Sequence, residues 1–248
     1  MKMPKMILFD YGDTLLLEPD YNSLRGTMAL MRYMIKNPLN VSAIEINQHS
    51  KQLWENICQP LRDQGFEFHN FCFQKLLYES LGIEFSLSSI QQEQIFWDAA
   101  TCGVKTEGIE ELLEYLWNKE IRTGVISNIS FSSQSLKDRI NRLLPNNHFE
   151  FIITSSDYMV RKPNHLLFEV ALKKAGLFAS DVWFCGDLIE VDCKGANQVG
   201  IYSVLYRNII KNDIDSESIN FDCLVINDWQ QLITVLNTMH FGNKDDYL

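Results

Sequence analysis

The sequence has little positive charge and no long apolar run. Of its 248 residues, 22 are Lys or Arg and 32 are Asp or Glu, which gives a formal net charge of -10. Nucleic-acid binding without sequence preference needs a basic surface, so this balance argues against a nucleic-acid partner. No apolar stretch approaches the roughly 20 residues that a membrane-spanning helix needs, which argues against a membrane protein. A phosphorylated ligand stays compatible, because a few local donors and a metal ion can hold phosphate inside an acidic protein.

Signals for secretion and for cysteine-based structure are also lacking. The N-terminal residues lead directly into the apolar run Met6–Phe9, which is far too short for the apolar segment of a signal peptide. The cysteines form no Cys-x-x-Cys pair and have apolar neighbours: Cys58, Cys72, Cys102, Cys185, Cys193 and Cys223. We therefore expect a cytoplasmic protein with buried or half-buried free thiols, and neither a zinc site nor a disulfide framework.

Apolar runs are present instead as short segments spaced along the chain. With 46% hydrophobic and 22% charged residues, the chain can bury a sizeable core. We expect strands at Met6–Phe9, Thr123–Ile126, Phe149–Ile153, Val182–Cys185, Ile201–Leu205 and Phe221–Ile226. Solid apolar strands that alternate with helical patterns are typical of a parallel sheet covered on both faces. The predicted fold class is therefore α/β, with a doubly wound, Rossmann-like parallel sheet as its core.

The alternation is interrupted between about residues 20 and 98, where only helical patterns occur. Ser42 precedes a Glu by three residues, and Ser88 or Ser89 precedes a Gln by three residues, which is the capping-box pattern of a helix start. Because the block is too long for a loop, we predict an inserted all-helical cap domain at 18–99, on a core of 1–17 and 100–248. Its first helix would present one apolar face with Leu24, Met28, Met31 and Ile35. Its aromatic residues are expected to fill its own core: Trp54, Phe66, Phe68, Phe71, Phe73 and Trp97.

Polar residues follow several of the predicted strands, at the edge where open parallel sheets bind ligands. They occur at Asp10-Tyr11-Gly12-Asp13-Thr14, Ser127-Asn128, Arg161-Lys162-Pro163 and Gly186-Asp187, with Glu190 and Asp192 close behind. The set combines carboxylates for a hard cation, a hydroxyl donor and a fixed ammonium. A phosphoryl group needs that combination.

The order of these segments resembles the haloacid dehalogenase superfamily. Asp-x-x-x-Thr, a strand-end Ser, Lys-Pro and Gly-Asp-x-x-x-x-Asp follow one another as the four motifs of that superfamily do. The helical block stands where the family inserts its helical type-1 (C1) cap, and the resemblance covers nearly the whole chain. It implies a Mg²⁺-dependent phosphohydrolase that acts on a small phosphorylated metabolite through an aspartyl-phosphate.

The resemblance also implies a role for each motif residue. Asp10 would be the nucleophile that attacks phosphorus. The hydroxyl of Ser127 and the backbone N–H of Asn128 would bind the phosphate. Lys162 would hold the phosphate and balance the charge of Asp10.

For the metal, the resemblance implies that Mg²⁺ is bound by Asp10, the carbonyl of Gly12 and Asp187. Asp192 would be a direct or water-mediated ligand. Such a site fits the preference of Mg²⁺ for few protein ligands and several waters. Thr14 would stabilise the loop by hydrogen bonding.

One position departs from the family pattern. The usual phosphatase form is Asp-x-Asp-Gly-Thr, whose second Asp protonates the leaving oxygen, but here Gly12 stands there and the carboxylate comes next, at Asp13. Loss of a general acid/base costs on the order of 10² to 10⁴ in rate. Asp13 could act as a displaced acid/base, or the substrate could have a leaving group that needs no protonation. Alternatively, the protein could be a catalytically impaired phosphate- or metal-binding or regulatory protein.

Motion of the cap is expected on hinges near Leu15–Glu18 and Ala99–Gly103, so that it closes over the site and excludes water. Nothing in the sequence indicates a particular substrate or an oligomeric state.

Overall fold

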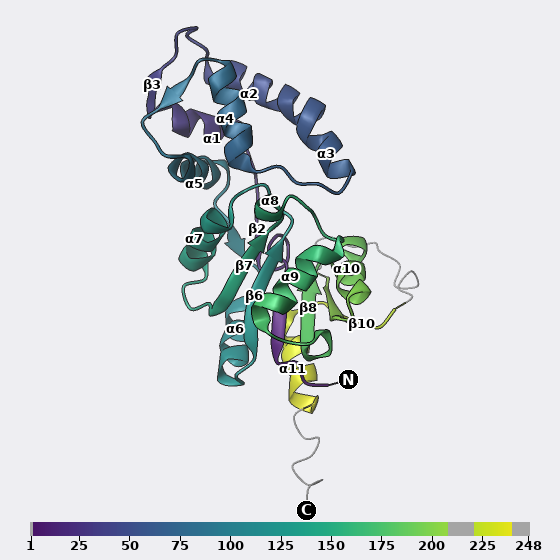
Figure 1. The fold of residues 1–248 in the computed structure, drawn as a ribbon. Helices are drawn as coiled ribbons and strands as arrows, with labels where there is room; N and C mark the ends of the chain where they lie inside the picture. The colour runs from purple at the N-terminus through teal and green to yellow at the C-terminus, as the bar shows by residue number, and fades with distance from the viewer. Residues whose placement is uncertain (1, 208–220, 240–248) are drawn as a thin grey trace, which may run out of the picture.

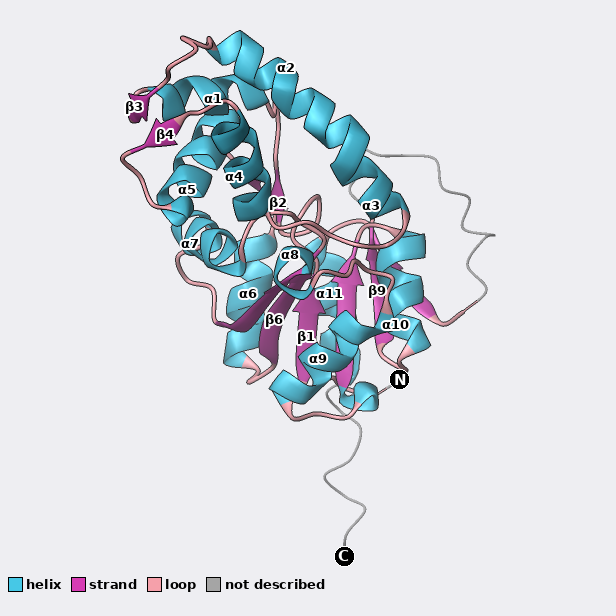
Figure 2. Cartoon of the chain, turned by 45° about the horizontal axis from the view of Figure 1, so that its top comes forward, coloured by secondary structure: helices cyan, strands magenta, loops and turns pink. Residues whose placement is uncertain are grey.

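A helical block lies above the carboxyl ends of a layered α/β core (Figures 1 and 2). The computed structural model describes residues 2–207 and 221–239. The polar stretch 208–220, predicted as a surface loop, lies outside the described residues. Within the described ranges, no helix is both long and apolar enough to cross a lipid bilayer.

The core is a six-stranded sheet with the order β10-β9-β8-β1-β6-β7, in which every described pair is parallel. The strands span β1 Met6–Phe9, β6 Arg122–Ser127, β7 Phe149–Thr154, β8 Val182–Gly186, β9 Tyr202–Tyr206 and β10 Cys223–Ile226. The predicted strands and the doubly wound α/β class are thus confirmed. The chain leaves β1 toward β6 on one side and later returns to β8 on the other. Such a reversal of strand order is where ligands bind in open α/β sheets.

Helices cover both faces of the sheet because the side chains of each strand alternate between the faces. Ile7 and Phe9 of β1 belong to the apolar cluster formed with α6, α7 and α11, whereas Met6 and Leu8 pack with α9 and α10. The helices of the core are α6 Ile109–Asn118, α7 Ser133–Leu143, α8 Ser155–Tyr158, α9 His165–Ala175, α10 Lys194–Gln198 and α11 Trp229–Met239. Figure 2 shows α9 and α10 in front of the sheet and α6 and α11 behind it.

The helical block has its own apolar cluster, separate from those of the sheet. Its helices are α1 Ser23–Met31, α2 Ala43–Leu53, the π-helix Trp54–Cys58, α3 Gln59–Asp63, α4 Asn70–Ser80 and α5 Ser89–Ala100. Both predicted capping boxes are present, with Ser42 and Glu45 at the start of α2 and Ser88 and Gln91 at the start of α5. The chain enters and leaves the block through an antiparallel pair of short strands, β2 Leu16–Leu17 and β5 Val104–Lys105.

Three sequence-based expectations about side-chain burial and helix length are wrong. The first helix ends at Met31, and Ile35 lies instead on β3 Met34–Lys36, which pairs with β4 Glu84–Phe85. The buried face of α1 consists of Gly26, Thr27 and Leu30, because Gly26 meets the backbone of α5 so closely that a Cβ would lie 2.8 Å from the carbonyl of Phe96. The thiols of Cys72 and Cys102, expected to be at least half-buried, are exposed.

Candidate active site

Asp10 lies directly beyond β1, at the carboxyl edge of the sheet and next to its reversal point. Its backbone N–H donates to the carbonyl of Cys185 on β8 at 2.8 Å, and its side chain is almost fully buried. The apolar run of β1 buries the strand on both faces, so the first polar residue after it is held at the edge by its neighbours.

Lys162 reaches into this edge from the segment before α9 and links the carboxylates there. Its Nζ donates to Asp10 Oδ1 at 2.6 Å and to the carbonyl of Ile126 at 3.0 Å. The same Nζ lies 2.7 Å from Asp192 Oδ1, and all three side chains are buried. One ammonium therefore serves two buried carboxylates, which leaves that group of three with an excess negative charge when both are ionised.

The pKa of Asp10 reflects this arrangement. The pKa of Asp10 is raised overall from 3.8 to about 6: burial, the largest effect, and the neighbouring charge of Asp192 raise it, while the ammonium of Lys162 lowers it. The pKa of Lys162 is raised by the two carboxylates, which outweigh the effect of its burial. Lys162 thus stays protonated at neutral pH, and Asp10 is mostly ionised there.

Asp187 joins Asp10 and Asp192 in a group with the composition of a cation site. One carboxylate oxygen from each residue lies within 4.8 Å of those of the other two. The buried Asp192 Oδ1 accepts no hydrogen bond of good geometry although the ammonium is near, while its Oδ2 accepts the N–H of Leu188 at 3.1 Å. Carboxylate oxygens at this spacing suit a hard divalent cation such as Mg²⁺.

The backbone of β8 makes the approach of Asp192 possible. A Cβ on Gly186 would lie 2.5 Å from the side chain of Asp192, so only glycine fits at this position. Asp192 itself belongs to the π-helix Ile189–Cys193, which follows β8. The extra residue of a π turn redirects side chains, and such turns are frequent at functional sites.

Ser127 ends β6, beside Asp10, and Asn128 follows it directly. Ser127 is buried at the strand end. The Asn128 carboxamide grips the backbone of Lys162: its Nδ2 donates to the Lys162 carbonyl at 2.9 Å, and its Oδ1 accepts the Lys162 N–H at 2.7 Å. The sequence predicted only a backbone role for Asn128, since a contact between residues 34 positions apart leaves no local signal.

The loop after Asp10 departs from regular backbone at Asp13. This residue has a φ of +56°, which is uncommon outside glycine, and its N–H donates to the carbonyl of Leu16. Asp13 is half-buried and is not a member of the carboxylate group found among the described residues. A Cβ on Gly12 would meet nothing within 4 Å, so packing does not require glycine there.

Thr14 does not make the hydrogen bond that the sequence led us to expect. Its buried hydroxyl has no hydrogen-bond partner among the described residues, whereas its carbonyl accepts the hydroxyl of Thr106 at 2.8 Å.

The sequence missed Glu67, a buried carboxylate of the helical block that contacts the core. Its Oε2 accepts the Ser155 hydroxyl at 3.0 Å and pairs with Arg161, the residue before Lys162. Its Oε1 accepts Arg62 Nε at 2.9 Å, and its N–H donates to the carbonyl of Met159. The block is thereby joined to the segment that carries the site lysine.

A second buried glutamate, Glu93 of α5, makes a similar junction. Its Oε2 accepts the N–H of Ser132 at 3.0 Å and also the Ser132 hydroxyl, at the start of α7. Its Oε1 accepts Asn70 Nδ2 at 3.1 Å, and the Asn70 N–H donates to the carbonyl of Ser130. Nothing in the local sequence distinguishes Glu67 or Glu93 from surface glutamates.

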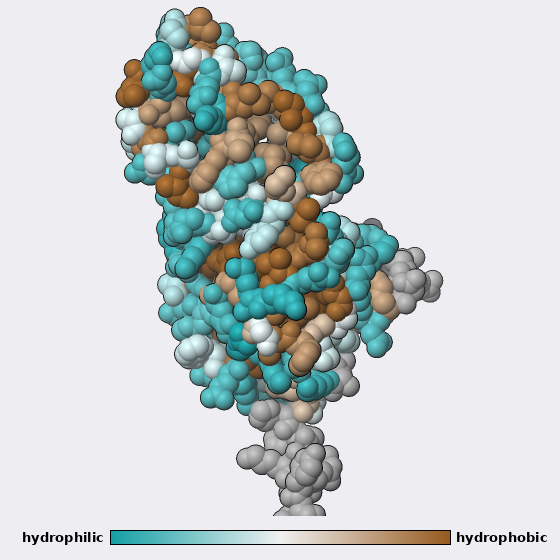
Figure 3. All heavy atoms as spheres, viewed as in Figure 1, coloured by the Kyte–Doolittle hydropathy of each residue, from teal (hydrophilic) through white to brown (hydrophobic). Residues whose placement is uncertain are grey.

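A cavity of about 480 Å³ lies between the helical block and the loop after β6. Its floor includes Asn128 and the following residues to Phe131, and its walls come from α1, α2, the π-helix, α3, α4 and α5. Figure 3 shows apolar residues gathered around a hollow in this block.

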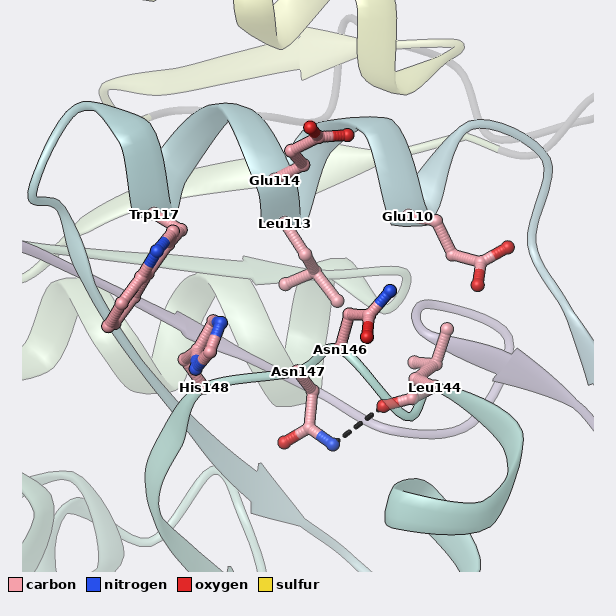
Figure 4. A pocket seen from close by; sticks show the side chains of 8 residues that line it. All are labelled: Glu110, Leu113, Glu114, Trp117, Leu144, Asn146, Asn147 and His148. Atoms are coloured by element: carbon pink, nitrogen blue, oxygen red, sulfur yellow. Dashed lines mark hydrogen bonds between the residues drawn. The ribbon is translucent and has the colours of Figure 1, made fainter.

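A smaller pocket of about 270 Å³ lies elsewhere, between α6 and the residues before β7, where Trp117 stacks on His148 (Figure 4). Trp117 is largely exposed.

Comparison with known proteins agrees with this geometry. The sequence profile of the haloacid dehalogenase-like hydrolase family matches residues 75–206, which is more than half of the chain.

Among curated proteins, the chain is similar to two proteins named glyceraldehyde 3-phosphate phosphatase. The one from Methanocaldococcus jannaschii is 25% identical, over 96% of this chain and 99% of the relative. The one from Pyrococcus furiosus is 27% identical, over 99% of this chain and 98% of the relative.

Among solved structures, the fold is similar to a 2-haloacid dehalogenase from Pseudomonas syringae pv. Tomato. The TM-score is 0.63 at 22% identity, over 95% of this chain and 99% of the other. A phosphatase from Thermococcus onnurineus has a TM-score of 0.62 at 18% identity, over 95% and 98% of the two chains.

Proposed function

The chain belongs to the haloacid dehalogenase-like hydrolases, and from that membership we propose that it is a Mg²⁺-dependent phosphatase of small phosphorylated metabolites with Asp10 as nucleophile. The observation that carries the proposal is the buried contact of Lys162 with both Asp10 and Asp192. The names of the full-length relatives, which are phosphatases of a phosphorylated three-carbon sugar, support the reaction class. The helical block, residues 18–99, would be the cap of this enzyme.

The proposed reaction has two displacements at phosphorus: Asp10 is the attacking group in the first and the leaving group in the second. A carboxylate oxygen of Asp10 would attack phosphorus, and the ester P–O bond would break to give an aspartyl-phosphate and an alcohol, which takes up a proton. Water would then attack the phosphorus of the aspartyl-phosphate, releasing inorganic phosphate and regenerating the carboxylate. The ammonium of Lys162 lies where it would hold phosphate oxygens and keep Asp10 ionised.

The residues present fit a magnesium ion. Asp10, Asp187 and Asp192 offer carboxylate oxygens within 4.8 Å of one another, and the carbonyl of Gly12 is proposed to complete the set. Mg²⁺ would supply charge neutralisation for the phosphoryl oxygens when bound. Ser127 would donate its hydroxyl to a phosphate oxygen, with the N–H of Asn128 beside it.

For proton transfer we propose Asp13. An aspartate held at a φ of +56° in this loop is a local strain, and such strain is often kept where a side chain must be directed. The family's acid/base normally stands at the position of Gly12. Packing leaves room there for a side chain, so the absence of a carboxylate at this position is not imposed by the fold. A catalytically impaired binding protein is the competing interpretation.

The test is Mg²⁺-dependent release of phosphate from an aryl phosphate by the wild type, Asp10→Asn, Asp13→Asn and Gly12→Asp. We expect Asp10→Asn to abolish turnover, and Asp13→Asn to lower it by about 10². Gly12→Asp, which has room for its Cβ, should retain the fold. If the wild type is inactive and Gly12→Asp gains turnover, the impaired interpretation holds. Turnover that survives in Asp10→Asn would refute the nucleophile assignment.

A further inference from the structure

The cavity between the helical block and the β6 loop shares Asn128 with the proposed phosphate site. Asn128, which grips the backbone of Lys162, also lines the cavity. Asn128 stands two residues after Ile126, whose carbonyl accepts the Lys162 ammonium. Ile129, Ser130 and Phe131 extend the floor away from the strand end. A phosphate held at Ser127 and Lys162 would therefore direct the rest of its molecule into this space.

We propose that this cavity selects phosphate monoesters whose alcohol part is bulky, uncharged and apolar or aromatic. The inference rests on the proposed phosphatase function and deepens it. A cavity of about 480 Å³ is within the range of small-molecule sites and is much larger than a three-carbon sugar needs.

Aromatic side chains form one part of the cavity wall, beside polar residues such as Asn47 and Asn70, and they pack on one another without being fully buried. Trp54 and Phe68 meet edge to face with ring centroids 5.6 Å apart, and Phe73 lies 5.7 Å from Phe68. All three are only half-buried. Phe73 packs against the apolar cluster of the block, as expected, whereas Trp54 and Phe68 are not part of that cluster. Phe131, by contrast, is buried and stacks on Trp97 at 4.1 Å, which makes the floor rigid. An apolar ligand that covers half-exposed rings buries their apolar surface, which favours binding.

The backbone presents Trp54 through an irregular turn. Trp54 opens the π-helix between α2 and α3, and its carbonyl accepts the N–H of Gln59. In the described residues the other π-helix is Ile189–Cys193, which carries Asp192. Both irregular turns thus carry a side chain that faces the candidate site or its cavity, as expected where a π turn directs a functional side chain.

The charges of the cavity argue against a second anionic group on the substrate. Arg62 is already bound to Glu67 at 2.9 Å, and its guanidinium lies 4.5 Å from the centre of the Trp54 ring. Lys51 is largely exposed at the rim and faces Glu55 at 3.8 Å. A carboxylate or second phosphate in the cavity would lose its hydration and meet cations that already have carboxylate partners, which is costly.

The test uses phosphate esters of primary alcohols that differ in one feature each. Ethyl phosphate is the reference, phenethyl phosphate adds a ring, and phosphoglycolate adds a carboxylate at the same chain length. With Mg²⁺, we expect kcat/KM to be at least about tenfold higher for phenethyl than for ethyl phosphate, and lowest for phosphoglycolate.

Trp54→Ala should lower kcat/KM for phenethyl phosphate about tenfold, mainly by raising KM, and should change kcat/KM for ethyl phosphate less than twofold. Trp117→Ala removes an exposed tryptophan at the distant pocket and should change neither.

Binding measured by calorimetry to Asp10→Asn separates this inference from the proposed function. If phenethyl phosphate binds more tightly than ethyl phosphate, and Trp54→Ala removes the difference, the cavity assignment holds even when no variant hydrolyses an aryl phosphate. If the protein hydrolyses aryl phosphate but binds and hydrolyses the three esters equally well, the inference is overturned. A preference for phosphoglycolate that depends on Lys51 would also overturn it, because the cavity would then recognise a second anion.

Discussion

At the scale of single residues, the buried ammonium of Lys162 determines how the site can hold its charges. It contacts Asp10 at 2.6 Å and Asp192 at 2.7 Å, and Asn128 fixes its backbone. Burial alone would drive Asp10 toward its protonated form, and the ammonium opposes this. Lys162 therefore favours the ionised form of Asp10, the proposed nucleophile, and the carboxylates favour the charged form of Lys162.

We predict that Lys162→Met destabilises the metal-free protein by about 3–5 kcal/mol at pH 8, since breaking a buried pair leaves uncompensated charge. The pKa of Asp10 is already raised from 3.8 to about 6, so its contribution to stability is fully present below pH 3.8 and is lost as pH rises through 6. Without the ammonium this pKa rises further. At a pH above the new pKa, each additional unit lowers the free energy of unfolding by about 1.4 kcal/mol. The loss should therefore be smaller at pH 5 than at pH 8, as measured by urea unfolding in EDTA.

Lys173→Met, on the exposed side of α9, is the matched control and should change stability by less than about 0.5 kcal/mol at either pH. A loss for Lys162→Met that is equal at pH 5 and pH 8 would contradict the charge argument.

At the scale of elements, α7 contacts both of the segments through which the chain passes between the core and the helical block. Arg139 is buried on α7, and its guanidinium donates to Glu18 through Nε at 3.0 Å and Nη2 at 2.8 Å. It also donates to Asp98 at 2.8 Å and to the carbonyl of Thr101 at 3.0 Å. Glu18 and Thr101 lie in the two segments expected to be hinges. One arginine thus holds both of them.

We predict that Arg139→Met lowers the free energy of unfolding by about 3–5 kcal/mol, because Glu18 is left without its two-pronged partner. Arg139→Lys should recover less than half of this, since an ammonium cannot reproduce the planar fork.

Arg142→Met is the control: Arg142 lies one turn later on α7, is half-exposed and pairs with the same Asp98 at 2.5 Å. It should cost less than about 1 kcal/mol in the same denaturant titration. Equal losses for Arg139→Met and Arg142→Met would rule out the hinge role.

The elements show what a sequence can and cannot reveal. Strand runs such as Met6–Phe9 and the capping boxes at Ser42 and Ser88 were predictable, because the pattern lies within the element itself. The motif residues were placed at the correct edge because parallel strands all end on the same side. The partners of Arg139 were not predictable, since Glu18 is 121 positions away. The short pair β3–β4 was also missed: its strands are too brief for periodicity, and tertiary pairing decided them.

At the scale of the whole molecule, two buried glutamates hold the helical block against the core. Glu67 accepts hydrogen bonds from Ser155 and Arg161, and Glu93 accepts the N–H of Ser132. In this arrangement the block packs on the core, and its helices form the walls of the cavity. These two carboxylates are among the polar contacts that opening would have to break, and they are the buried ones, so they contribute to the balance between closed and open forms.

We predict that the double substitution Glu67→Ala with Glu93→Ala shifts this balance toward an open form. Each loss leaves a buried donor of the core without its acceptor, which costs about 1–3 kcal/mol and favours exposure of that donor to water. Amide hydrogen exchange at Ser132 and Asn70, whose N–H groups lie in the junction, should accelerate about ten- to hundredfold, and the radius of gyration in solution should increase. Glu55→Ala with Glu79→Ala removes the same charge from exposed positions of the block and should change neither quantity. If the Glu67 and Glu93 variant exchanges as slowly as the wild type, apolar contacts rather than the buried carboxylates hold the block closed.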